Sequence, residues 1–128
     1  MFNWNKYLEL GKELMSSDDE CNKRAGISRI YYGLYNLARR KMSNDLLNDL
    51  GKEPGGLHKK TWEEFFSDDS EDDKVALMAA NVARSARNYA DYDSSSYKLS
   101  VFFKNNRQDI RRCFTCVYER LCKKPNLW

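Results

Sequence analysis

The sequence has one histidine, His58, among 128 residues, and it lacks the glycine-rich loop that cradles phosphates in many nucleotide-binding proteins. It has no apolar run of the length that a membrane span needs, and the residues after Met1 lack the apolar core of a signal peptide. Internal repeats and a long heptad pattern are missing too. These absences argue against a membrane protein, a repeat array and a coiled coil, and they predict a soluble cytoplasmic protein.

The four cysteines are few for a disulfide scaffold and suit a compartment where thiols stay reduced. Cys113 and Cys116 form a C-x-x-C, but three of the four cysteines lie in one stretch that reads as continuous helix. Metal-binding knuckles need a turn between their ligands, and the sole histidine is far away in sequence. We therefore expect apolar core thiols, with no metal and no other cofactor. The cysteines are Cys21, Cys113, Cys116 and Cys122.

Helical periodicity recurs in five segments, and no segment reads as a convincing strand. Apolar residues make up 41% of the chain and aromatic residues 13%, which argues against a disordered chain. Residues 1–128 are therefore predicted to form one all-α domain, an antiparallel bundle of about five helices. The predicted helices cover about 4–15, about 19–49, a short segment that begins near Leu57, a segment from the acidic loop 67–73 to Tyr92, and a last segment from the serine-rich turn 94–96 to Pro125.

The apolar stripes indicate which helix faces are buried. On the second helix Gly26 and Gly33 lie seven residues apart on one side, which predicts a place where another helix comes very close. The stripe of the last helix includes Ile110, Phe114, Val117 and Leu121. The fourth helix is expected to face the core with Val75, Met78, Ala79, Val82, Ala86 and Tyr89.

The formal net charge of +3 is unevenly spread along the chain. Residues 20–41 contain six basic side chains and one acidic one, residues 98–124 contain eight basic and two acidic, and five acidic side chains crowd into residues 67–73. Basic stretches of this kind can meet a phosphate backbone, or they can simply be solvated helix faces.

The end of the fourth helix carries the most informative residues of the chain. Arg87 and Asp91 lie four apart, as do Arg84 and Asn88, so all four project from one side of the helix. Such a cluster can bind a phosphate and position a proton acceptor. The same spacing also fits an ion pair on a helix surface.

Three features in this order resemble a known family. A tyrosine-rich segment with small residues covers 28–38, His58 follows a glycine-bearing loop, and the pattern R-x-x-A-D-Y ends the fourth helix at Arg87–Tyr92. Together they resemble the HEPN superfamily of small all-α proteins, particularly its branch with that R-x-x-A-D-Y pattern. The resemblance extends from about residue 4 to about residue 122.

The resemblance implies a homodimer whose paired arginine motifs line a shared cleft. Many members of the superfamily are metal-independent ribonucleases of prokaryotic toxin–antitoxin or anti-phage defence systems, and some toxins act beside nucleotidyltransferase-type antitoxins. Arg87 matches their arginine, but the histidine that follows it in those enzymes is absent here. By resemblance, Arg84 and Arg87 would hold the phosphate of RNA, Asn88 would orient it, Tyr92 would border it, and Asp91 or His58 would be the candidate catalytic base.

Two further functions stay open beside binding and cleavage of RNA. The chain could be a catalytically silent HEPN module that binds a nucleotide or a partner protein, such as a nucleotidyltransferase. It could also be a helical adaptor whose charged cluster is a dimer contact. The tyrosines Tyr31, Tyr32 and Tyr35 could stack on bases or could belong to a core or an interface.

Overall fold

The computed structural model describes residues 2–42, 56–92, 110–125 and 127–128. These residues contain the labelled helices α1 (Trp4–Met15), α2 (Glu20–Arg40), α4 (Leu57–Phe65) and α5 (Glu71–Tyr92), together with helix 110–122. None of the residues in these ranges lies in a strand. The predicted all-α helical bundle is confirmed, while the start of the predicted last helix lies outside the described residues.

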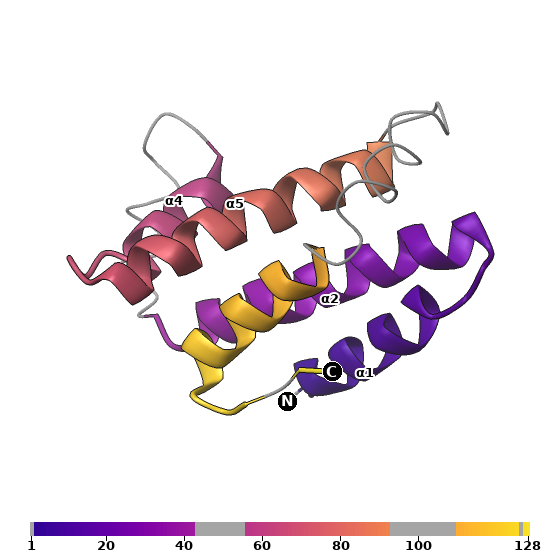
Figure 1. Ribbon diagram of the computed structural model, residues 1–128, viewed down its shortest axis with the longest axis horizontal. Coiled ribbons are helices and arrows are strands. Elements are labelled where there is room, and N and C mark those ends of the chain that lie inside the picture. The colour runs from indigo at the N-terminus through magenta and orange to yellow at the C-terminus, as the bar shows by residue number, and fades with distance from the viewer. Residues whose placement is uncertain (1, 43–55, 93–109, 126) are drawn as a thin grey trace.

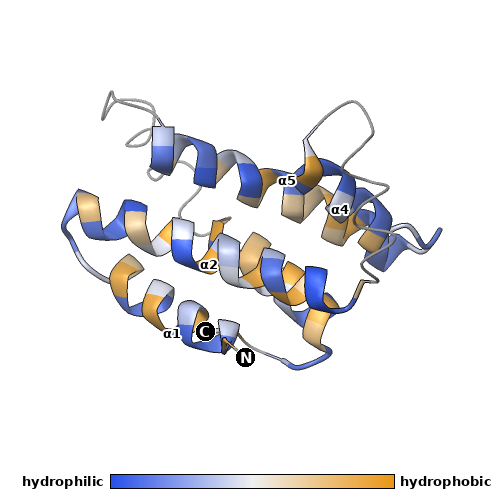
Figure 2. Cartoon of the chain, turned by 180° about the vertical axis from the view of Figure 1, so that it is seen from behind, coloured by the Kyte–Doolittle hydropathy of each residue, from blue (hydrophilic) through white to orange (hydrophobic). Residues whose placement is uncertain are grey.

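Helix α2 runs through the middle of the molecule (Figure 1). Helix α1 packs along one side of α2 as an antiparallel hairpin, α5 lies on its other side with α4 next to it, and helix 110–122 runs beside α2. In the reverse view, the apolar residues of α1 and α2 are concentrated where the helices face one another (Figure 2). The central position of α2 brings it into contact with α1, α4 and α5.

The hairpin of α1 and α2 is as close as the glycines predict. A Cβ on Gly26 would lie 2.7 Å from the backbone nitrogen of Met15 and 2.8 Å from the carbonyl oxygen of Gly11, and a Cβ on Gly33 would lie 2.7 Å from a methyl carbon of Leu8. Backbone atoms cannot move aside as a flexible side chain can. The absence of side chains at these positions therefore fixes how near α1 approaches α2.

The second helix ends earlier than predicted. Helix α2 stops at Arg40, and residues 41–42 form a turn in which the backbone N–H of Met42 donates to the carbonyl oxygen of Arg39. A single helix from 19 to 49 is therefore wrong; residues 43–49 lie outside the described residues. The sequence after Met42 continues with serine, asparagine and aspartate, residue types that favour helix ends over helix interiors because their side chains compete for backbone hydrogen bonds.

The buried face of α5 differs from the predicted one. Ala79 and Ala86 are buried as expected, but Met78 is 69% exposed, and Val75, Val82 and Tyr89 are exposed as well. Small side chains face the bundle instead, because only they allow α5 to lie close to its neighbours. The buried alanines are Ala76, Ala79, Ala80, Ala83, Ala86 and Ala90.

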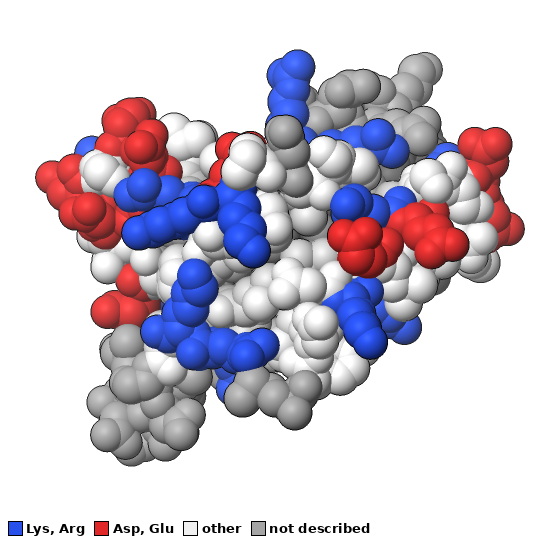
Figure 3. Space-filling model, turned by 90° about the horizontal axis from the view of Figure 1, so that it is seen from below, with Lys and Arg blue, Asp and Glu red and all other residues white. Residues whose placement is uncertain are grey.

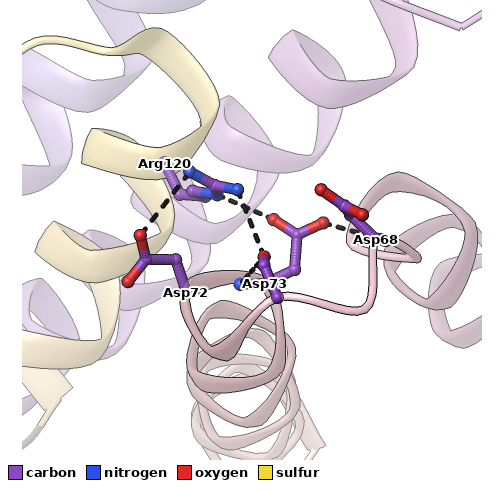
Figure 4. Close-up of polar contacts among 5 residues, drawn as sticks. Asp68, Asp72, Asp73 and Arg120 are labelled. Carbon is purple, nitrogen blue, oxygen red and sulfur yellow. Dashed lines mark hydrogen bonds and ion pairs between the residues drawn. The ribbon is translucent and has the colours of Figure 1, made fainter.

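Helix 110–122 is tied to the beginning of α5 by an ion pair (Figure 4). Arg120 donates from Nε to Oδ1 of the buried Asp73 at 2.7 Å, and its Nη1 lies 3.9 Å from Asp72. The other carboxylate oxygen of Asp73 accepts a hydrogen bond from the backbone N–H of Asp68. The backbone N–H of Asp73 donates to the Oγ of Ser70. These contacts set the start of α5, while Ile110, Phe114, Val117 and Leu121 are buried as their stripe predicts.

The cysteines follow the expected pattern only in part. Cys113, Cys116 and Cys122 are partly buried, and all three pack against the core. Cys21 is exposed at the start of α2, so the prediction of a core thiol is wrong there. Within the described ranges, none of the helices combines the length and the apolar character that crossing a membrane requires.

Replacement of Gly26 by alanine tests the close helix contact. We expect Gly26→Ala to lower the free energy of unfolding by about 1–3 kcal/mol, because the added methyl group meets backbone atoms of α1. Gly56→Ala is the matched control, since nothing lies within 4 Å of a Cβ there. Urea denaturation followed by circular dichroism measures both; equal stability of the two variants would contradict the close contact.

Candidate anion-binding site

Arg87 is buried, with 8% of its surface exposed, although it belongs to the polar end of α5. Its guanidinium carbon lies 5.3 Å from the centre of the Tyr31 ring, 5.4 Å from that of Tyr32 and 5.7 Å from that of Tyr92. Three aromatic faces at these distances attract the cation and replace part of its lost hydration. A simple ion pair on the helix surface is therefore not how Arg87 is held.

The carboxylate expected to pair with Arg87 is only loosely engaged. Oδ2 of Asp91 lies 4.0 Å from Nη1 of Arg87, and Ser28 donates a long hydrogen bond of 3.4 Å to the same oxygen. The Nε of Arg87 has no hydrogen-bond partner among the described residues. Asp91 therefore offsets the charge of Arg87 only partly.

His58 lies in the first turn of α4 and joins the same aromatic group. Its ring stacks on Tyr35 with the two centres 3.8 Å apart, and its Nδ1 is hydrogen-bonded to the hydroxyl of Tyr31 at 2.9 Å. Trp62, one turn further along α4, donates from Nε1 to the same hydroxyl at 3.0 Å. Because Arg87 covers the ring of Tyr31, the structure brings His58 and Arg87 to the same tyrosine, which the sequence alone did not establish.

Two more arginines surround this group. Arg39 lies over the ring of Tyr35 at 5.6 Å, and Arg84 is half-buried one turn before Arg87 on α5. Like Arg87, both have a buried Nε without a hydrogen-bond partner among the described residues. The site therefore holds three guanidinium groups and one loosely engaged carboxylate, that of Asp91. Such an excess of buried positive charge is typical of a site for an anion.

Burial and the surrounding positive charges keep His58 neutral. Burial and then the positive charges of Arg87, Arg84 and Arg39 lower the pKa of His58 to about 4. Burial raises the pKa of Tyr31 to about 12, although its hydrogen bond with Trp62 and the charge of Arg87 act in the opposite direction. At neutral pH both side chains are therefore uncharged, and the positive charge of the site resides on its arginines.

The structure groups some of the residues proposed from the sequence and separates another. Arg84, Arg87 and His58 converge on the tyrosines of α2, and Asp91 and Tyr92 lie at their edge. Asn88 is exposed, and its side chain has no hydrogen bond or ion pair with another described residue. Arg39 was missed from the sequence, although Tyr31, Tyr35 and Arg39 follow one another at intervals of four on a single face of α2.

Comparison of the chain with protein-family models, with curated proteins and with solved structures finds no match. The resemblance to the HEPN superfamily therefore stays a prediction that rests on residues 28–38, His58 and Arg87–Tyr92. The chemistry of the site has to be argued from its own geometry.

The pKa of His58 provides a direct test of the arginine cluster. As the only histidine, His58 gives one set of ring signals in NMR, and we expect its titration midpoint at about 4 in the folded protein. Arg84→Gln and Arg39→Gln should each raise the midpoint, because each removes a positive charge that disfavours the imidazolium. Lys6→Gln on α1 removes an exposed charge from another helix and should leave it unchanged.

The stability of the protein should follow the same titration. Between pH 6.5 and about 4 the unfolded chain binds a proton at His58 that the folded protein does not, so the contribution of His58 to stability falls as the pH is lowered through this window. A wild-type midpoint at the ordinary histidine value would contradict both the burial of His58 and its place beside the arginines.

Proposed function

We propose that the protein binds RNA, with a backbone phosphate at Arg39, Arg84 and Arg87. The convergence of three guanidinium groups on a neutral histidine is the observation that supports this function best. Each arginine has a buried Nε without a partner among the described residues, so no described acceptor of the protein saturates its guanidinium group at that atom. A bound phosphate would supply the negative charge that Asp91 supplies only in part.

An RNA chain fits the site better than a free phosphate because of Tyr92. Tyr92 is 73% exposed as a residue, and the guanidinium carbon of Arg87 lies 5.7 Å from the centre of its ring. A nucleotide whose phosphate meets Arg87 can therefore stack its base on Tyr92, as in proteins that hold single-stranded nucleic acids on aromatic platforms. On the face seen from below in Figure 3, which is the α1 side of the molecule and not the side of α4 and α5, basic side chains gather in one part and acidic side chains lie toward the ends and among them.

The resemblance to HEPN proteins extends this proposal to a toxin–antitoxin or anti-phage defence role with metal-independent cleavage of RNA. Cleavage requires a group that takes the 2′-hydroxyl proton, and Asp91 and His58 are the candidates. Oδ2 of Asp91 lies 4.0 Å from Arg87 and accepts a long hydrogen bond from Ser28, and Nδ1 of His58 is hydrogen-bonded to the hydroxyl of Tyr31. Binding is therefore the function that the geometry supports best, and cleavage remains the prediction of the resemblance.

Removal of the charges of the half-buried Arg39 and Arg84 tests RNA binding without substitution of a fully buried residue. The double variant Arg39→Gln/Arg84→Gln should weaken binding to a short single-stranded RNA about tenfold or more, because it removes two charge-assisted phosphate contacts. The slope of log affinity against log salt should fall by about 0.7 for each lost contact. Fluorescence anisotropy over a range of salt concentrations measures both quantities.

Lys6→Gln/Lys12→Gln on α1 is the charge-matched control and should bind like the wild type. Equal weakening in both double variants would mean that only net charge attracts RNA and would reject the site. The same samples, incubated with RNA in EDTA, test cleavage: products made by the wild type and absent from Asp91→Asn would support the resemblance, and intact RNA would leave a binding protein.

The exposed face of α5 favours a second function, the association of protein chains. Val75, Met78, Val82, Tyr89 and Tyr92 are all exposed and follow one another at spacings of three, four, seven and three residues, which align them in one stripe along the helix. A row of large apolar side chains on a helix is typical of an interface. We infer that this stripe, here called the α5 stripe, is where a second copy of the chain packs. The silent-module alternative would place an operon-encoded partner protein on the same stripe.

A charge introduced into the α5 stripe tests self-association. The wild type should sediment as a dimer, and Met78→Glu should shift it toward the monomer and raise the dissociation constant about tenfold or more, because a carboxylate would be buried between apolar side chains. Leu10→Glu is the matched control on α1, where the leucine is also exposed. A monomeric wild type at high concentration would contradict a dimer, and equal dissociation of both variants would place the interface elsewhere.

A further inference from the structure

A chain of hydrogen bonds runs through the aromatic group from Trp62 to Tyr31 to His58. The indole Nε1 of Trp62 can only donate, so the hydroxyl oxygen of Tyr31 accepts that bond. Tyr31 has 0% of its surface exposed, and its single hydroxyl proton must then find an acceptor. Nδ1 of His58, 2.9 Å away, is the only other hydrogen-bonding atom within reach of this hydroxyl among the described residues.

This direction of the bonds determines where the proton of the neutral imidazole sits. If Nδ1 accepts from Tyr31, then Nε2 carries the proton of His58. The opposite arrangement, in which Nδ1–H donates to Tyr31, would leave the buried hydroxyl proton of Tyr31 without an acceptor among the described residues. The stacking of the imidazole on Tyr35, with ring planes 9° apart, fixes the plane of the ring and therefore the direction of Nε2.

We infer that Trp62 and Tyr31 are positioning residues that hold His58 as its Nε2–H tautomer, so that His58 offers the bound RNA a hydrogen-bond donor. This role rests on the proposed function, because the acceptor is the phosphate that the three arginines attract. It also has a chemical consequence. A nitrogen that carries the proton cannot abstract another, so Nε2 of His58 is not set to act as the base for cleavage.

The tautomer can be observed in the free protein, independently of RNA. As the protein has one histidine, a long-range ¹H–¹⁵N spectrum at pH 7 shows a single pair of ring nitrogens. We expect a protonated, pyrrole-type Nε2 and an unprotonated, pyridine-type Nδ1. Tyr31→Phe should change the Nδ1 signal toward that of a solvent-exposed imidazole, because it removes the donor while it keeps the ring that Arg87 covers. A wild-type spectrum with the proton on Nδ1 would overturn the inference.

Substitutions of His58 test the donor role in RNA binding. The amide nitrogen of glutamine reaches the position of Nε2 and donates, so His58→Gln should lower the affinity less than about threefold, whereas His58→Leu should lower it about tenfold. Equal losses in the two variants would overturn the donor role. Failure of the proposed function has a different signature: the wild type and Arg39→Gln/Arg84→Gln would then bind RNA equally, while the spectrum would still report the tautomer.

Discussion

Small residues on both sides of α2 are the constraint on which the rest of the structure depends. Gly26 and Gly33 let α1 lie against one side, and the alanine face of α5 packs on the side away from α1 (Figure 1). Tyr31 and Tyr35 of α2 are buried, and His58 from the first turn of α4 and Arg87 from the last turns of α5 both pack against their rings. The close approach of the helices therefore creates the place where the arginines meet the histidine.

Burial of the charged Arg87 at this place costs free energy unless the charge is stabilised, and the surrounding side chains stabilise it only in part. Three tyrosine rings attract the guanidinium group, but the nearest carboxylate oxygen is 4.0 Å away and the Nε has no hydrogen-bond partner among the described residues. Arg120, by contrast, donates from its Nε to the buried Asp73 at 2.7 Å, so its charge is directly paired with a carboxylate (Figure 4). This difference in charge pairing between Arg120 and Arg87 is one physical reason to regard Arg87 as part of a ligand site.

The helices and the close approach at Gly26 could be predicted from the sequence, because periodicity and glycine spacing are local properties. The buried face of α5 could not. Its alanine stripe and its valine–methionine–tyrosine stripe both follow the helical period, and hydrophobicity favours the larger residues. The choice is made by the distance between α5 and α2, which only small side chains permit. The contact between His58 and Tyr31 was out of reach for a related reason, since it depends on how α4 is placed against α2, whereas the spacing of Tyr35 and Arg39 on α2 was a signal that the sequence already held.

Tyr92 links the two surfaces that the structure leaves exposed. It belongs to the α5 stripe, and its ring also borders Arg87. A second chain on the stripe would therefore change the surroundings of the arginine cluster, and a base stacked on Tyr92 would change the surface offered to that chain. Two ligands that share a side chain cannot bind independently, and the effect of each on the other is equal in free energy. If association orders Tyr92 against Arg87, it strengthens RNA binding; if it covers the ring, the two partners compete.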